Sequence, residues 1–98
     1  MSSDPLAQRI ARMHTTIEHK REIRAVLLEQ VEAWRNIVQD ARLRNLMTET
    51  PLSCNDLKET SRHLLIAEDE LIRVSAELEV LTEQRDSLLR EWVPGVNV

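Results

Sequence analysis

The sequence is poor in glycine and in aromatic residues. It has one glycine, three prolines, no phenylalanine or tyrosine, and two tryptophans, Trp34 and Trp92. One glycine cannot supply the glycine-rich loops that bind phosphates or dinucleotides, and the low content of aromatic and β-branched residues argues against a β-sandwich or barrel. No run approaches the ~18 consecutive apolar residues of a membrane span, and the polar first five residues are unlike a signal peptide. The expected class is a small helical protein.

Charge is unevenly distributed along the chain. The 98 residues include 13 Lys and Arg and 17 Asp and Glu, a net charge of −4, and this balance argues against nucleic-acid binding through phosphate neutralisation. The first fifty residues contain eight basic and seven acidic side chains, whereas the rest contain five and ten. Two helices of opposite sign would attract each other when packed side by side. A single cysteine, Cys54, cannot form an intramolecular disulfide, so we expect an intracellular and cytoplasmic protein.

The spacing of apolar residues predicts a long first helix over residues 5–47. Asp4 is a favourable N-cap, and Pro5 suits the first helical position, where its missing N–H costs nothing. Pro51 biases the residue before it out of the helical conformation, so the helix should end near Met47. A seven-residue repeat predicts left-handed supercoiling around a partner helix. Its stripe consists of Leu6, Ile10, Met13, Ile17, Lys20, Arg24, Leu27, Val31, Trp34, Val38 and Ala41.

A second capping pattern leaves another division of the first helix open. Thr15 followed three residues later by Glu18 also fits a capping box, so residues 5–14 could form a separate short helix. The seven-residue repeat runs through Thr15 and Thr16 without a break, which favours one continuous helix.

A second helix is expected over residues 54–92, after a turn at 48–53 and before a short tail at 93–98. Because some six residues join two helices of similar length, the helices must pack antiparallel. The sequence therefore predicts one all-α domain, a coiled-coil-like antiparallel two-helix hairpin. The second stripe consists of Leu57, Thr60, Leu64, Ala67, Leu71, Val74, Leu78, Leu81, Arg85, Leu88 and Trp92.

The start of the second helix carries the most specific local pattern. Ser53 is the expected N-cap, with Asp56 three residues later in the position of its capping-box partner. Leu52 and Leu57 occupy the two positions of a hydrophobic staple, which fixes the angle at which a chain enters a helix. This pattern places the start of the second helix immediately after Ser53.

Both helices carry a second line of apolar residues beside the main stripe. A contiguous exposed apolar patch usually marks an interaction surface, although single apolar side chains occur on the surface of every protein. We expect a four-helix bundle, completed either by homodimerisation or by another helical chain. The predicted partner-binding residues are Ile23, Val26, Ala33 and Ile37 in the first helix, and Leu65, Ile72 and Ala76 in the second.

Two arginines, Arg24 and Arg85, interrupt the stripes. Pairing of the helices about the predicted turn brings Arg24 near Glu77 and Arg85 near Glu18. We expect these interhelical ion pairs to set the register and the oligomeric state at some cost in stability. The alternative is that the arginine stems lie along the stripe while their charged heads reach water.

Residues with catalytic or metal-binding chemistry are few and scattered. His14 with Glu18, and Glu59 with His63, are four residues apart and could each place two ligands on one helical face. A structural zinc site needs four ligands, and a di-iron bundle needs a Glu-x-x-His motif on two helices. Cys54 has no histidine near it in sequence that could activate it as a nucleophile. We therefore expect no enzyme, no metal and no cofactor.

The expected function is a non-enzymatic protein–protein interaction module, such as a scaffold, an adaptor or a small subunit of a larger complex. In outline the predicted hairpin resembles the small-GTPase-binding coiled-coil domains of Rho effectors. It departs from them in the first helix, where Val31-Glu32-Ala33-Trp34-Arg35 occupies the place of their glycine-alanine-glutamate-asparagine element. In size and acidity it resembles the helical chaperones of bacterial secretion systems. The alternative is a small acidic regulator, inhibitor or chaperone of a protein partner. Its acidic face would consist of Glu68, Asp69, Glu70, Glu77, Glu79 and Glu83.

Overall fold

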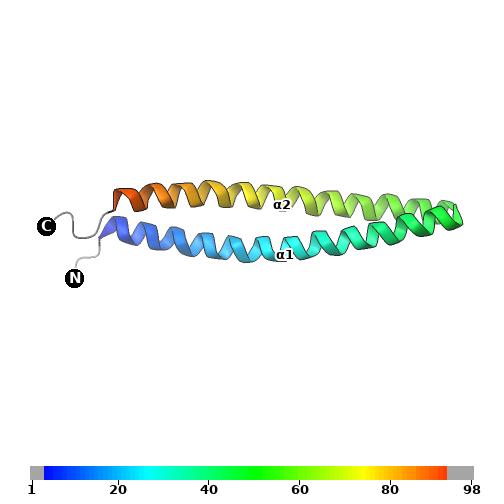
Figure 1. Ribbon diagram of the computed structural model, residues 1–98, viewed down its shortest axis with the longest axis horizontal. Helices are drawn as coiled ribbons and strands as arrows, with labels where there is room; N and C mark the ends of the chain where they lie inside the picture. The colour runs from blue at the N-terminus through cyan, green and yellow to red at the C-terminus, as the bar shows by residue number, and fades with distance from the viewer. Residues whose placement is uncertain (1–3, 93–98) are drawn as a thin grey trace.

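The computed structural model describes residues 4–92, which form two long helices joined by a tight turn (Figure 1). Helix α1 spans Pro5–Thr48 and helix α2 spans Pro51–Glu91. The helices lie side by side and antiparallel, so both ends of the described chain lie at one end of the molecule and the turn lies at the other. This confirms the predicted all-α hairpin. The single continuous first helix that the seven-residue repeat favours is observed, since α1 runs without a break from Pro5 to Thr48. The alternative of a separate helix over residues 5–14 is therefore excluded, and the predicted tail over 93–98 lies outside the described residues.

The start of α1 follows the predicted capping pattern. Asp4 Oδ1 accepts a hydrogen bond from the backbone N–H of Leu6 at 3.0 Å, and Pro5 occupies the first helical position. The other carboxylate oxygen of Asp4, Oδ2, accepts a hydrogen bond from the indole Nε1 of Trp92 at 2.8 Å. One aspartate therefore caps α1 and also ties it to the C-terminal end of α2.

Helix α2 begins three residues earlier than predicted, and its N-cap is Thr50 rather than Ser53. The backbone of Thr50 is extended, as a following proline requires, and Pro51 fits the first helical position. The backbone N–H of Ser53 donates to Thr50 Oγ1, and the backbone N–H of Thr50 donates to Ser53 Oγ, both at 3.1 Å. Ser53 is thus the partner in the capping box. Leu52, expected in a hydrophobic staple, is 79% exposed.

The short turn depends on Glu49, which has a left-handed backbone conformation with φ 49° and ψ 37°. Its backbone N–H donates to the carbonyl oxygen of Asn45 at 2.9 Å and so satisfies one carbonyl at the end of α1. This C-cap position favours glycine, because a Cβ atom is sterically disfavoured there. Glu49 and Thr50 alone separate the helices, so the turn is shorter than the six residues predicted.

Replacing Glu49 by glycine should stabilise the hairpin by about 1 kcal/mol, because glycine adopts the left-handed conformation without steric cost. Urea unfolding followed by circular dichroism measures this difference. Glu29→Gly is the matched control: Glu29 is exposed in the middle of α1, where glycine should cost about 0.5–1 kcal/mol instead. A loss of stability in Glu49→Gly would contradict the role given to this residue.

All buried residues of the described chain belong to the two predicted stripes. They are Ile17, Leu27, Val31, Val38 and Ala41 in α1, and Thr60, Ala67, Val74 and Leu78 in α2. Ile17 is completely buried and packs in one cluster with Leu27, Val74 and Leu78. The hydroxyl of Thr60 donates to a backbone carbonyl one turn earlier at 2.9 Å, so its burial leaves no polar atom unpaired. These residues form the seam between the helices.

Candidate protein-binding surfaces

The first exposed apolar surface, the Ile23 face, runs along one side of the seam. Ile23 and Val26 line an open groove of about 470 Å³ together with Glu70 of α2. Ile66 lies four residues before Glu70 and therefore on the same side of α2. Val80 borders a neighbouring groove that contains the side chain of Lys20. The Ile23 face consists of Ile23, Val26, Ala33 and Ile37 from α1 and of Ile66 and Val80 from α2.

The second exposed apolar surface, the Leu28 face, consists of Ala25 and Leu28 from α1 and of Leu65 and Ile72 from α2. The two α1 residues line an open groove of about 510 Å³ together with Ser75. Leu65 and Ile72 flank Glu68 at helical spacing, so all three lie on one side of α2. The carboxylate of Glu68 lies 3.7 Å from the guanidinium of Arg35, which fixes this side of α2 next to α1.

The Ile23 face and the Leu28 face lie on opposite sides of the hairpin. The grooves that mark them flank the same part of α1 but share no residue. All seven predicted partner-binding residues are exposed, yet only the four from α1 belong to the Ile23 face. Leu65 and Ile72 belong to the Leu28 face, and Ala76 borders the groove of Val80. One partner helix therefore cannot cover all seven residues.

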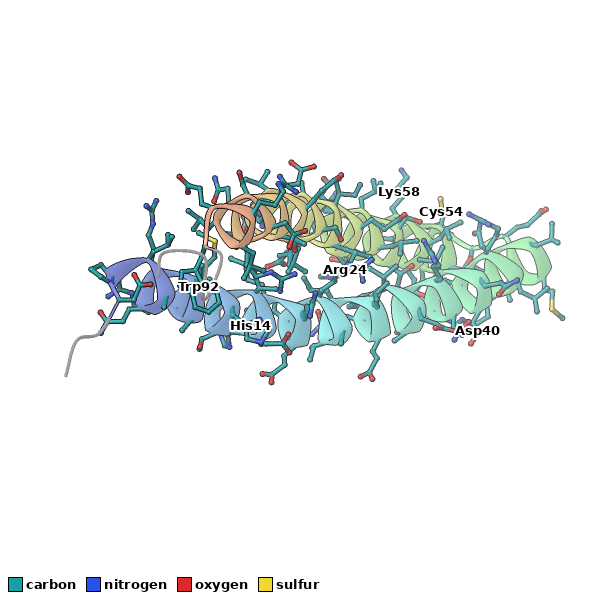
Figure 2. All side chains as sticks on the ribbon, turned by 60° about the vertical axis from the view of Figure 1, so that its left-hand side comes forward. His14, Arg24, Asp40, Cys54, Lys58 and Trp92 are labelled. Carbon is teal, nitrogen blue, oxygen red and sulfur yellow. The ribbon has the colours of Figure 1, made fainter. Side chains whose placement is uncertain are left out.

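The ion pair across the middle of the seam is formed by Lys20 and Glu77, whereas the sequence predicted Arg24 and Glu77. Lys20 Nζ donates to Glu77 Oε2 at 2.7 Å. Arg24 lies between the two helices (Figure 2), and its Nε donates to Ser75 Oγ at 2.9 Å. The hydrogen bond from Lys20 and its charge lower the pKa of Glu77, with help from Arg73 and against the opposing effect of desolvation.

The stability of the hairpin should depend on pH through Glu77. Because the pKa of this carboxyl is lower in the folded chain, its ionised form stabilises the fold above the ordinary glutamate pKa, and the contribution is lost as the pH falls through the lowered value. We expect Glu77→Gln to be less stable than the wild type at neutral pH and this difference to shrink in acid. Urea unfolding between neutral pH and about pH 3 measures it. In a Lys20→Met background the difference should largely disappear, and its persistence would contradict the pairing.

The second predicted ion pair, between Arg85 and Glu18, is also wrong. Arg85 Nη2 lies 3.3 Å from Asp86 Oδ1 in its own helix, and Arg85 Nη1 lies 3.4 Å from His14 Nδ1 of α1. Glu18 instead pairs within α1, where its Oε1 lies 2.7 Å from Arg21 Nη1. Both errors have one cause, since the turn is shorter than predicted and shifts the pairing of the helices. The basic residues of the stripe therefore face other partners.

A stacked aromatic contact crosses between the helices. The rings of Trp34 and His63 have centroids 4.6 Å apart and planes inclined by 14°. His63 lies three residues before Ile66, so the stack borders the Ile23 face. Sequence reasoning missed this contact because it considered His63 only as a possible metal ligand beside Glu59, and the contact depends on the register that the turn sets.

The most exposed apolar side chains lie near the turn, and sequence reasoning missed them as a surface. Leu46, Met47 and Leu52 are 71%, 77% and 79% exposed, respectively. Leu43 is also exposed and lines a shallow groove with Leu46. The available signal was the cluster of large apolar residues that lie off the stripe between Ala41 and the turn. These side chains make the turn end of the hairpin apolar.

Half of the predicted acidic face is neutralised by the chain itself. Glu68 pairs with Arg35 across the helices at 3.7 Å, and Glu77 pairs with Lys20 at 2.7 Å. Within α2, Glu70 lies 3.9 Å from Arg73. These pairs reduce the negative charge that the face could offer to a basic partner, which weakens the interpretation of the chain as a charge-driven regulator.

Residues with catalytic or metal-binding chemistry come together at most in pairs within residues 4–92. His14 Nε2 lies 4.0 Å from Glu18 Oε1, while His63 is stacked on Trp34. Cys54 is an exposed free thiol toward the turn end of α2 (Figure 2). Within residues 4–92, no three potential metal ligands come together.

Comparisons with known proteins gave no match to a protein-family model, to a curated protein or to a solved structure. In the described part of the chain, neither helix offers a stretch long and apolar enough to cross a membrane. The surface chemistry of the hairpin is therefore the basis for a functional proposal.

Proposed function

We propose that the chain is a non-enzymatic helical protein–protein interaction module, which serves as a scaffold, an adaptor or a small subunit of a larger assembly. One observation carries this proposal: within residues 4–92, eight apolar side chains are buried whereas thirteen large ones are exposed. Contiguous exposed apolar surface usually marks an interaction site. The two helices contact each other along only one side each, so their flanks remain available to other helices.

The Ile23 face is the surface that best fits a helix of another protein. On α1 its apolar residues recur at spacings of three and four, which is the pattern into which a partner helix packs its own apolar side chains. Burial of each aliphatic side chain would contribute roughly 1–2 kcal/mol. Charged residues at the edge of the face, including Glu70 and Arg73, would favour one orientation of the partner. A partner helix in this position would extend the hairpin into a helical bundle.

The proposed location is the cytoplasm or another reducing compartment inside the cell. Cys54 is the single cysteine of the chain, and its thiol is exposed. An exposed thiol without a disulfide partner is typical of intracellular proteins, where glutathione and thioredoxin keep cysteines reduced.

The proposed function is tested by Val26→Glu, which places a charge in the middle of the Ile23 face. Val26 is 53% exposed, so the variant should keep the helicity of the wild type. The control is Asn36→Glu, which adds the same charge at an exposed position of α1 away from the seam. In affinity capture from extracts of the source cells, we expect a helical partner that binds the wild type and Asn36→Glu, but not Val26→Glu.

Salt concentration separates this function from that of a charge-driven acidic regulator. An interaction driven by apolar burial should survive washing at about 1 M salt, where exposed charges are screened beyond roughly 3 Å. Identical sets of captured proteins for the wild type and both variants would refute the role of the Ile23 face. Loss of every captured protein at high salt would favour the acidic regulator instead.

A further inference from the structure

The Leu28 face differs from the Ile23 face because its charges are segregated by helix. Basic side chains predominate on the α1 edge, and acidic side chains predominate on the α2 edge, with apolar residues between them. The groove of this face already shows the pattern, since two arginines of α1 and two glutamates of α2 line it. On α1 the face carries Arg21, Arg24 and Arg35 together with two acidic residues, Glu18 and Glu32, and on α2 it carries Glu68, Glu79 and Glu83. Within one hairpin Arg21 pairs with Glu18 and Arg35 pairs with Glu68.

We propose that the Leu28 face binds a second copy of the same chain. The two-fold axis would run parallel to the long axis of the hairpin, so that α1 of each copy lies against α2 of the other. This homodimer is a four-helix bundle in which neighbouring helices are antiparallel and opposite in charge. The inference rests on the proposed interaction function and names the occupant of one of its two faces.

The contacts within one hairpin define which residues would meet across this dimer. Arg24 lies level with Ser75, and Arg35 lies level with Glu68, because each pair is in contact. A two-fold axis parallel to the helices keeps these levels unchanged in the second copy. Leu28 therefore meets Ile72 of the second copy at the centre of the face. About two turns away, Arg21, which also pairs with Glu18 of its own helix, meets Glu79 of the second copy.

The other two-fold arrangement, with the axis perpendicular to the helices, is disfavoured by charge. It would lay α1 on α1 and α2 on α2, so that Arg21 approaches Arg35 of the second copy. Like charges facing each other across an interface are costly, whereas complementary charges fix register and orientation. The distribution of charge along the chain agrees with this, since the first fifty residues carry a small positive excess and the rest are strongly acidic.

The dimensions of the hairpin allow an interface of ordinary size. Its Cα atoms extend over 75 × 21 × 13 Å, so one broad side exceeds the roughly 800 Å² that each partner buries in a standard interface. The groove of the Ile23 face has acidic side chains on both helices, Glu22 of α1 and Glu70 of α2, so its two edges are not opposite in charge. The dimer would leave the Ile23 face accessible to a different protein.

The dimer is tested first by sedimentation equilibrium of the purified chain. We expect twice the monomer mass of 11.4 kDa, and at least a tenfold rise in the dimer dissociation constant for Ile72→Glu. Ile72 is 67% exposed in the hairpin, so helicity by circular dichroism should be retained. Val26→Glu on the Ile23 face is the matched control and should remain dimeric. A monomeric wild type, or a dimer lost in Val26→Glu but kept in Ile72→Glu, would overturn the proposal.

A charge exchange tests the pairing without changing an apolar residue. Arg21→Glu and Glu79→Arg should each weaken the dimer at low salt, because each places like charges opposite one another. The double variant should recover most of the wild-type affinity, because it restores opposite charges at the same place. Failure of the double variant to recover, with helicity intact in all three proteins, would contradict the proposed contact.

The orientation is tested with a spin label on the natural thiol of Cys54, which lies toward the turn end of α2 (Figure 2). In the proposed dimer both labels lie at the same end, and at helix spacings of about 8–10 Å we expect a label distance on the order of 20–30 Å. The perpendicular axis would separate the labels by about 50 Å, at 1.5 Å per residue. The longer distance would refute the orientation.

The dimer and the proposed function fail in different experiments. If the chain is monomeric but its capture of a partner still depends on Val26, the dimer proposal is refuted and the proposed interaction function is supported. If dimerisation depends on Ile72 but capture of partners is unaffected by Val26→Glu, the dimer proposal is supported and the proposed role of the Ile23 face is refuted. Sedimentation and capture with this pair of variants therefore decide the two proposals separately.

Discussion

Replacing Ile17 by alanine is expected to lower the free energy of unfolding by about 3 kcal/mol, within the range for buried isoleucine-to-alanine changes. Ile17 has no exposed surface and lies in the cluster that joins α1 to Leu78 and Val74 of α2. The seam is one layer of side chains between two helices, so its other residues cannot close around the cavity without moving a helix. In a domain of this size such a loss should lower the melting temperature by roughly 12–24 °C.

The matched control for this prediction is Ile66→Ala, since Ile66 lies on α2 but is 58% exposed. A change at such a surface position should alter the free energy of unfolding by no more than about 0.5 kcal/mol. Thermal and urea unfolding of both variants, at one protein concentration, measures the difference between them. Equal losses for Ile17→Ala and Ile66→Ala would mean that the seam described above does not hold the hairpin together.

Replacing Trp34 by alanine should have the next largest effect, a loss of about 2–3 kcal/mol. Trp34 is half-buried, and its indole packs both on the seam and on the ring of His63. The loss is smaller than that of a fully buried tryptophan because part of the ring faces water. Urea unfolding followed by far-ultraviolet circular dichroism measures this loss without relying on the fluorescence of the residue that is removed.

A double-mutant cycle isolates the stacking contribution. Trp34→Ala, His63→Ala and the double variant should give a coupling free energy of roughly 0.5–1.5 kcal/mol, the range for aromatic pairs. Trp34→Phe is the control, because it keeps an aromatic ring at this position and should be closer to the wild type than Trp34→Ala. Strict additivity of the two alanine substitutions would show that the stack adds nothing to the burial of the indole.

The core could be predicted from the sequence because it depends only on periodicity. Each buried residue, from Ile17 to Leu78, follows the three- and four-residue spacing that places side chains on one side of a helix. The start of α1 could also be predicted, since the effects of Asp4 as N-cap and of Pro5 at the first helical position involve only neighbouring residues in the chain. The same reasoning applied to Thr50 and Pro51 would have placed the start of α2 correctly. Ser53 competes with Thr50 as an N-cap in the sequence because its pattern with Asp56 also fits a capping box.

The contacts between the helices could not be read from the sequence in the same way. Glu77 was expected to meet Arg24 and meets Lys20, because a turn shortened by a left-handed Glu49 shifts one helix along the other. Glycine or asparagine, and not glutamate, is the usual residue in this conformation, so the short turn could not be predicted from Glu49. Such a shift leaves the apolar stripes facing each other but gives Arg24 and Glu77 other polar partners, Ser75 and Lys20.

The sequence by itself determined that this chain forms two long helices, that they fold back on each other, and which side chains lie between them. These features follow from local signals and from the helical repeat, both of which act over a few residues. Only the tertiary structure decided which flank carries each exposed apolar residue. That assignment placed Val26 and Ile72 on opposite sides of the hairpin. The physical reason is that a flank is formed by two helices together, so its composition depends on their register and rotation.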